Sequence, residues 1–209
     1  MLPVLPLPFQ WLRSPWPEEL FSLTERAGHL RLFGRETLGS WFRQALVARR
    51  QEAHCFSAAT SVEFEPQHFQ QQAGLCCYYN TSKLHYFYIS HDEKLGKHLR
   101  VMSRRPDQLV YDVFTAPIPI APGEPVELCV EVDHERLYFG YRVAGGPREW
   151  LPEPFDASIL SDEATAPGAP NFTGAFVGMA CQDLAGTRQP ADFDYFDYSS
   201  REFRADPRV

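Results

Sequence analysis

Apolar and polar residues alternate along several short stretches of this chain, a pattern typical of β-strands with one buried face. The clearest stretch is VELCVEV, in which every second residue from Val126 to Val132 is apolar, while Glu127, Cys129 and Glu131 would face outward. A similar apolar alternation runs from 137 to 143, after the polar tetrapeptide DHER at 133–136. The pattern therefore predicts a hairpin with its turn at DHER.

Weaker alternation predicts further strands along the chain, bounded by Gly- and Pro-containing turns. The expected strands are 9–12, 30–33, 42–49, 56–65, 74–79, 84–90, 98–104 and 111–114. Residues 69–73 are expected to form a turn or loop, and turns at 80–83 and 91–97 would make 74–104 an antiparallel meander of three strands. The Pro-rich segment 150–170 is expected to be a long loop with a short helical turn capped by Asp156.

The stretch from Asn171 to Tyr198 combines strand patterns with a run of carboxylates. Residues 175–181 are an apolar run of strand length, and a connection with Gly186 and Pro190 leads to a second, alternating run. The simplest interpretation is a hairpin. The alternation slips where Tyr195 is followed directly by Phe196, which predicts a β-bulge.

Composition agrees with one all-β domain, because aromatic residues make up 14% of the 209 residues, prolines number 18, and no helical period is sustained. We expect a two-sheet antiparallel β-sandwich with little helix. The domain is expected to span 9–203, after a Pro-rich linker at 1–8 and before a tail at 204–209. The linker, MLPVLPLP, lacks the basic start of a signal peptide and contains three prolines.

Charge and cysteine usage narrow the function classes. A net charge of -7 with scattered basic residues argues against a nucleic-acid surface, and no apolar run has the roughly 20 residues that a membrane span needs. The five cysteines are odd in number and lack CxxC spacing, so buried free thiols are favoured over a zinc site or a disulfide. Free thiols suit a reducing compartment, and we expect a cytoplasmic protein.

Two groups of carboxylates are candidates for chemistry. Glu131, Asp133 and Glu135 resemble the Glu-x-Asp-x-Glu strand motif of family 16 glucanases, and a retaining glycosidase needs two carboxyl groups about 5 to 5.5 Å apart. The turn at DHER argues against this alternative. Asp192, Asp194 and Asp197 are candidate ligands for a structural calcium ion, although a solvated strand face explains them equally well. We assign no catalytic residue and no metal ligand from these patterns.

Several long segments together resemble the C-terminal β-sandwich domain of glycoside hydrolase family 43 β-xylosidases, over residues 9–203. The segments are SLTERAGHLRLFGRETLGS, QALVARR, FQQQAGLCCYYN, YFYISHDEKLGKHLRVM and FTGAFVGMACQDLAGTRQPADFDYFDY. The resemblance implies a concanavalin A-like fold and a partner, a five-bladed propeller that carries the acid and base carboxylates. It also implies a xylo-oligosaccharide substrate, from which terminal xylose or arabinose is removed with inversion.

By its place in NFTGAFVG, Phe172 resembles the family's phenylalanine that walls the sugar pocket of the propeller. The resemblance also implies that this chain is inactive alone. An independent carbohydrate-binding module, using the concave face of the sandwich, is the alternative. A surface left uncovered without a propeller would be a candidate for self-association into a homo-oligomer.

Overall fold

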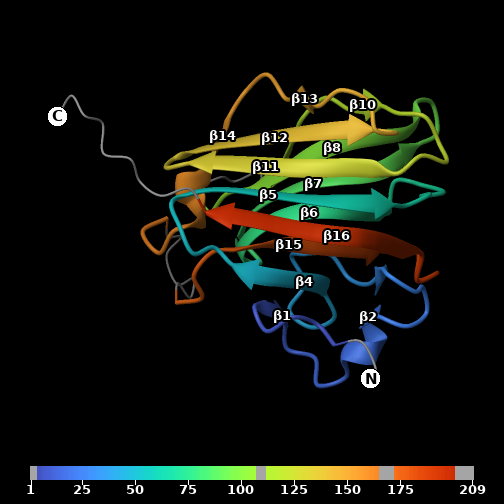
Figure 1. Cartoon of the computed structure of the whole chain (residues 1–209), viewed down its shortest axis with the longest axis horizontal. Coiled ribbons are helices and arrows are strands. Elements are labelled where there is room, and N and C mark those ends of the chain that lie inside the picture. Colours follow the sequence, from blue (N-terminus) through green and yellow to red (C-terminus); the bar gives the residue numbers. More distant parts are fainter. Residues whose placement is uncertain (1–3, 107–111, 165–171, 201–209) are drawn as a thin grey trace.

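Two antiparallel β-sheets stack face to face in the computed structural model, which describes residues 4–106, 112–164 and 172–200 (Figure 1). The predicted all-β sandwich is therefore confirmed. Helix is confined in these residues to two short 3₁₀ turns, η1 (Pro17–Glu19) and η2 (Ala157–Leu160). Asp156 caps η2 by accepting a hydrogen bond from the Ser158 amide, as its position in the sequence predicted.

The first sheet has the strand order β1-β4-β15-β6-β7-β8-β10, and β9 also pairs with β8. Its strands are β1 (Phe9–Trp11), β4 (Ala45–Arg50), β6 (Gln71–Asn80), β7 (Lys83–Asp92), β8 (Gly96–Arg104), β9 (Asp112–Phe114), β10 (Ile118–Pro119) and β15 (Phe176–Asp183). The order places β6, β7 and β8 side by side, which confirms the predicted meander. β4 begins later than expected, at Ala45, and β1 is the edge strand beside it.

The second sheet has the order β13-β12-β11-β5-β16-β3-β2, with β14 also paired to β12. Its strands are β2 (Phe21–Ser22), β3 (Leu30–Phe33), β5 (Cys55–Glu63), β11 (Val126–Asp133), β12 (Arg136–Val143), β13 (Glu149–Trp150), β14 (Phe155–Asp156) and β16 (Pro190–Ser200). The β11–β12 hairpin has the predicted register, with Asp133 opposite Arg136 across a two-residue turn.

The expected hairpin between the last two strands is wrong, because β15 and β16 lie in different sheets. β15 pairs with β4 and β6, whereas β16 pairs with β3 and β5. The connection therefore crosses from one sheet to the other. Asp183 organises it by accepting hydrogen bonds from the amides of Ala185 and Gln189, at 2.9 Å each. A turn-rich connection suits a hairpin and a crossing equally, so the local pattern could not separate them.

The loop expected at 69–73 is also wrong in part, since β6 already begins at Gln71. The Gln71 side chain is buried and donates a 3.0 Å hydrogen bond to the Thr187 hydroxyl. A polar residue can therefore start this strand without an unsatisfied group. The turn at 91–97 is shorter than expected, because β7 and β8 remain paired as far as Asp92 and Gly96.

The predicted β-bulge in β16 is confirmed. The register with β5 shifts between Phe193, which is opposite Val62, and Phe196, which is opposite Thr60. The shift takes the Tyr195 carbonyl out of the hydrogen-bond ladder. The Thr60 hydroxyl donates a 2.6 Å hydrogen bond to this carbonyl instead. The slip in alternation at 195–196 was therefore an accurate signal.

Apolar side chains form a core between the sheets and a second cluster on the outer face of the first sheet. In the second cluster, Leu38 from the loop before β4 covers Tyr78 and Tyr86, which are 3% and 0% exposed. The Gln44 amide fixes this loop by donating to the carbonyls of Leu38 and Ser40, at 2.6 Å each. Much of this outer sheet face is thus filled by the chain itself.

All five cysteines are free thiols, as expected, and four of them are buried. Burial raises the pKa of Cys129 to about 11 and raises the pKa values of Cys77 and Cys181 further above the ordinary range. These thiols behave as small apolar core residues. The fifth, Cys55, is half-buried at the start of β5.

Candidate functional site

The residue implicated by the family resemblance, Phe172, lies in the segment that enters β15 and is 97% exposed. Asn171 is outside the described residues. Single exposed apolar residues are common on folded surfaces, and Phe42 and Phe69 are also exposed, at 76% and 67%. The structure presents Phe172 outward at one end of the sandwich.

The backbone that follows Phe172 is fixed to the neighbouring strand β4. Arg50 donates a 2.8 Å hydrogen bond to the Thr173 carbonyl, and its guanidinium lies 4.8 Å from the centre of the Phe176 ring. One residue further on, the Gln51 amide donates to the Ala175 carbonyl at 2.9 Å. The exposed ring is thus attached to a well-anchored backbone.

Gly174 allows the turn in this segment because its φ of +75° lies in the left-handed region. A Cβ atom at this position would lie 2.8 Å from Nη1 of Arg50. The positive φ favours glycine at this position, and a larger residue would also push the Arg50 guanidinium away from its present place.

Tyr79 supports the same segment from beneath. Its ring is 1% exposed, its hydroxyl donates to the Asp162 carboxylate, and the backbone amides of Thr173 and Gly174 face its oxygen. Burial raises the pKa of Tyr79, and the hydrogen bond to Asp162 adds to this shift. A neutral hydroxyl therefore links Asp162 to the base of the Phe172 segment.

Lys83 extends this support to the segment after η2. Its ammonium nitrogen donates a 2.5 Å hydrogen bond to the Ser161 carbonyl and lies 3.7 Å from the centre of the Tyr79 ring. Burial lowers the pKa of Lys83. We call Arg50, Tyr79, Lys83, Asp162 and Gly174 the anchor of Phe172.

A cavity of about 530 Å³ lies beside the anchor, at the same end of the sandwich. Figure 1 shows η2, the turn between β11 and β12, and the start of β15 gathered at this end. The lining residues are Gln51, Glu52, Ala53, His54, His134, Glu135, Ala157, Ser158, Leu160, Ser161 and Ala175. This end therefore offers both a protruding aromatic ring and a hollow lined by polar and apolar side chains.

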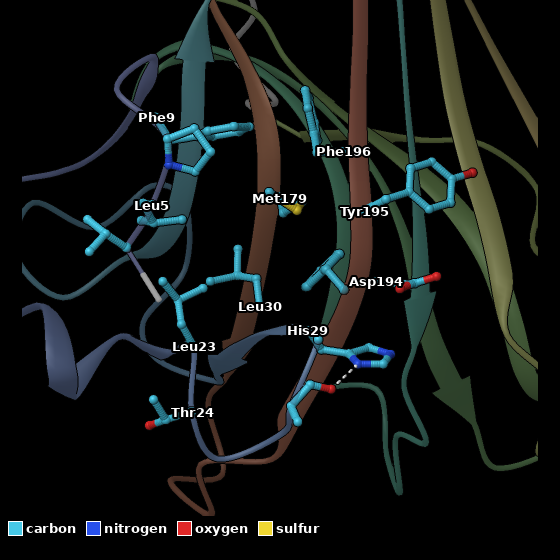
Figure 2. A pocket seen from close by; sticks show the side chains of 15 residues that line it. Leu5, Phe9, Leu23, Thr24, His29, Leu30, Met179, Asp194, Tyr195 and Phe196 are labelled. Carbon is cyan, nitrogen blue, oxygen red and sulfur yellow. Dashed lines mark hydrogen bonds between the residues drawn. The ribbon is translucent and has the colours of Figure 1, made fainter. Parts of the chain in front are cut away.

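A larger groove of about 600 Å³ opens where the N-terminal segment meets β16. Figure 2 shows Leu5, Leu23, Leu30 and Met179 around it, whereas Tyr195 points away. Leu5 packs against the core, so the segment expected to be a linker already contacts the sandwich. The groove is mostly apolar and shares no lining residue with the anchor.

The carboxylates predicted for a glucanase site do not form one row on a strand. Glu131 and Asp133 belong to β11, but Glu135 lies in the two-residue turn that leads to Arg136. His134 in that turn has a φ of +54°, which the turn requires. The motif is therefore a hairpin turn, as DHER indicated, and the glucanase alternative has no structural support.

The candidate calcium ligands have other surroundings. Asp192 accepts hydrogen bonds from Arg31 and Arg26, at 2.7 and 2.8 Å. Burial favours the neutral acid, but these two arginines outweigh it and lower the pKa of Asp192. Asp194 and Asp197 are exposed to solvent. A cation bound at Asp192 would have to displace two guanidinium groups.

Within the described parts of the chain, the group of three side chains close enough to share a metal ion is Cys55, Asp133 and His134. Cys55 lies 78 positions before Asp133 and 79 before His134 in the sequence, and no spacing motif joins it to them. The anchor was missed for the same reason. Tyr79, Asp162 and the other residues of the anchor carry no local signal that links them to Phe172.

The fold defines a class of protein, the two-sheet antiparallel β-sandwiches of concanavalin A-like type. A family model described as the beta xylosidase C-terminal concanavalin A-like domain matches residues 2–199. The chain belongs to this family. No helix in the described residues is long and apolar enough to cross a membrane.

Relatives agree with this assignment. The chain is 41% identical over 200 residues to the Beta-xylosidase of Bacillus subtilis (strain 168), covering 92% of this chain and 36% of the relative. It is 40% identical over 190 residues to a Putative beta-xylosidase of Escherichia coli (strain K12), covering 90% and 35%.

A crystal structure of xylan beta-1,4-xylosidase from Bacillus halodurans C-125 superimposes with a TM-score of 0.89 at 37% identity. The match covers 95% of this chain and 38% of that one. The chain thus spans little more than a third of the length of these relatives.

Proposed function

We propose that this chain is the accessory sandwich domain of a family 43 xylosidase or arabinofuranosidase, and that Phe172 walls the sugar pocket of a five-bladed propeller. The proposal has one main support, which is the presentation of a 97% exposed phenylalanine on an anchored backbone. The relatives add a second support, because nearly two thirds of their length lies outside the match.

In this proposal the propeller performs the chemistry. Inversion requires two carboxyl groups about 6.5 to 9.5 Å apart, so that one protonates the leaving oxygen and the other activates a water molecule. Phe172 would contact the apolar side of the sugar and exclude bulk water, which strengthens the polar interactions in the pocket. The residues Arg50 and Tyr79 would hold the ring at its place without touching substrate.

An independent carbohydrate-binding module is the rival function. A sheet face that binds sugar needs accessible aromatic rings, but Leu38 covers Tyr78 and Tyr86 on the outer face of the first sheet. Titration of the chain with xylotriose in a calorimeter separates the two functions. We expect no saturable heat, whereas a binding module gives a saturable isotherm.

The direct test uses a chimera, in which this chain replaces the matched part of the Bacillus subtilis Beta-xylosidase. We expect the chimera to hydrolyse 4-nitrophenyl β-D-xylopyranoside and this chain alone to be inactive. The truncated relative, without any sandwich, is the control and should be much less active. Hydrolysis by this chain alone would contradict the proposal.

The reduced thiols support a further part of the proposal, that the enzyme works in the cytoplasm. Four of the five free thiols are buried, where an oxidant has little access to them. Alkylation and peptide mass spectrometry of protein freshly purified from the native organism should find all five cysteines of this sandwich domain reduced. A mixed or intermolecular disulfide in that sample would argue for an oxidising compartment.

A further inference from the structure

We propose that Cys55, Asp133 and His134 bind a divalent transition metal ion, for which Zn²⁺ is the best match. Cys55 begins β5, Asp133 ends β11, and His134 follows it in the hairpin turn. This inference stands apart from the pocket proposed for Phe172 and rests on these three side chains alone.

The first argument is the arrangement of three possible ligand atoms. The Cys55 sulfur lies 3.4 Å from Oδ1 of Asp133 and 3.5 Å from Nδ1 of His134, and these two atoms are 2.8 Å apart. Tetrahedral zinc has bonds of about 2.0 to 2.3 Å, which places its ligand atoms about 3.3 to 3.6 Å from one another. Two separations already match, and the third needs to open by roughly half an ångström.

The second argument is that the backbone fixes these side chains before any metal binds. Cys55 and Asp133 are directly opposite each other in the antiparallel register of β5 and β11. The His134 amide donates a 3.0 Å hydrogen bond to the His54 carbonyl, which holds the turn against the start of β5. A ligand set on paired strands loses less conformational entropy on binding than one on free loops.

The third argument is the chemistry of the donors. One thiolate, one imidazole and one carboxylate are the ligand types that zinc uses, whereas calcium and magnesium prefer oxygen alone. Binding would release the thiol proton of Cys55 to solvent. The His134 ring would change to the tautomer that carries its proton on Nε2, so that bonds from Nδ1 and the Asp133 carboxylate to the metal replace the hydrogen bond between them. No oxidant or reductant is involved.

The fourth argument is access. The side chains of His134 and Asp133 are 48% and 71% exposed, so an ion can reach them and a water molecule can complete a tetrahedron. His134 also lines the cavity of about 530 Å³ that Ala175 borders from the Phe172 segment. The metal site therefore lies at the end of the sandwich that presents Phe172, and its fourth position is open, as in zinc sites that bind an external ligand.

The test is a titration of the reduced, metal-free chain with Co²⁺, followed by displacement with Zn²⁺. We expect a thiolate-to-cobalt absorption band, visible bands of tetrahedral cobalt, and one ion bound per chain with a Kd in the micromolar range. Cys55→Ser should abolish the thiolate band, and His134→Ala should weaken binding at least tenfold.

Cys129→Ala and His68→Ala serve as matched controls, since they remove a thiol and an imidazole from elsewhere in the fold and should leave the titration unchanged. Because the ligands are exposed, far-ultraviolet circular dichroism should show that the Cys55 and His134 variants remain folded. The proposal is overturned if the thiolate band is absent, or if Cys55→Ser binds cobalt as well as the unaltered chain. Binding that the two control variants weaken equally would also overturn it.

Discussion

Removal of the Tyr79 hydroxyl tests whether the anchor positions Phe172. Tyr79→Phe deletes the donor to Asp162 and the oxygen that faces the amides of Thr173 and Gly174, but keeps the buried ring. A hydrogen bond to a charged group contributes about 1.5 to 3 kcal/mol, and Asp162 is exposed to solvent, which favours the lower part of this range. We therefore expect a loss of about 2 kcal/mol in the free energy of unfolding, measured by urea denaturation of the chain.

Tyr86→Phe is the matched control, because Tyr86 is equally buried and its hydroxyl donates to the Ala180 carbonyl at 3.0 Å. This bond joins neutral groups on the opposite face of the sheet, so the expected loss of stability is about 1 kcal/mol. The control removes a tyrosine hydroxyl without touching the Phe172 segment.

Activity distinguishes the two variants. A shift of about 1 Å in a positioning group can cost roughly 100-fold in rate. In the chimera, we expect Tyr79→Phe to lower kcat/KM for the aryl xyloside by about 10-fold to 100-fold and Tyr86→Phe to leave it unchanged. Equal activity of both variants, measured well below their unfolding temperatures, would refute the positioning role of Tyr79.

Three further substitutions probe the fold and the anchor. Burial lowers the pKa of His85 to about 4, so the unfolded chain takes up a proton at higher pH than the folded one. The free energy of unfolding should therefore fall by about 3 kcal/mol as the pH drops from 7 to 4. With His85→Gln, urea denaturation at each pH should show a smaller fall over this range. Hydrogen bonds from Arg31 lower the pKa of Asp192, so its contribution to the free energy of unfolding is present above the unfolded pKa of about 3.9 and is lost in more acidic solution. Asp192→Asn should therefore lower the free energy of unfolding by about 2 to 3 kcal/mol at pH 7 and by much less at pH 2. Gly174→Ala places a methyl group 2.8 Å from the Arg50 guanidinium at a positive φ, and should cost about 1 to 2 kcal/mol and lower the activity of the chimera.

Each of these expectations has an outcome that would contradict it. An unchanged pH profile for His85→Gln would mean that other groups set the loss of stability between pH 7 and 4. The same cost for Asp192→Asn at pH 2 and pH 7 would show that charge is unimportant there. Full activity and stability of Gly174→Ala would show that the segment accommodates a side chain.

The sequence predicted the elements whose signal is local. Alternation from Val126 to Val132 gave the strand, its inward face and its turn, and the slip at Tyr195–Phe196 located the bulge, because side-chain direction alternates residue by residue. The sheet to which β16 belongs was not predictable in this way. Hairpins and crossings between sheets use the same turn residues, and strand pairing over long separations decides between them.

The candidate site shows the same difference between residues with a local sequence signal and residues that only the tertiary structure brings together. Phe172 is a candidate because a linear motif carries it, whereas the residues that support its segment come from four other segments. Arg50 belongs to β4, Tyr79 to β6, Lys83 to β7, and Asp162 follows η2. Likewise, Cys55 and Asp133 meet only through the pairing of β5 with β11. Such clusters depend on tertiary structure, and composition or spacing gives no sign of them.

The central claim is tested most directly by Phe172→Ala in the chimera, with Phe69→Ala as the matched control. Both rings are exposed, 97% for Phe172 and 67% for Phe69. Phe69 lies just before the start of β6, whereas Tyr79 of the anchor lies near the end of that strand. We predict that Phe172→Ala lowers kcat/KM for 4-nitrophenyl β-D-xylopyranoside about tenfold or more, equivalent to about 1.4 kcal/mol of transition-state stabilisation, and that Phe69→Ala has no effect. Equal activity of the unaltered chimera and Phe172→Ala would contradict the account.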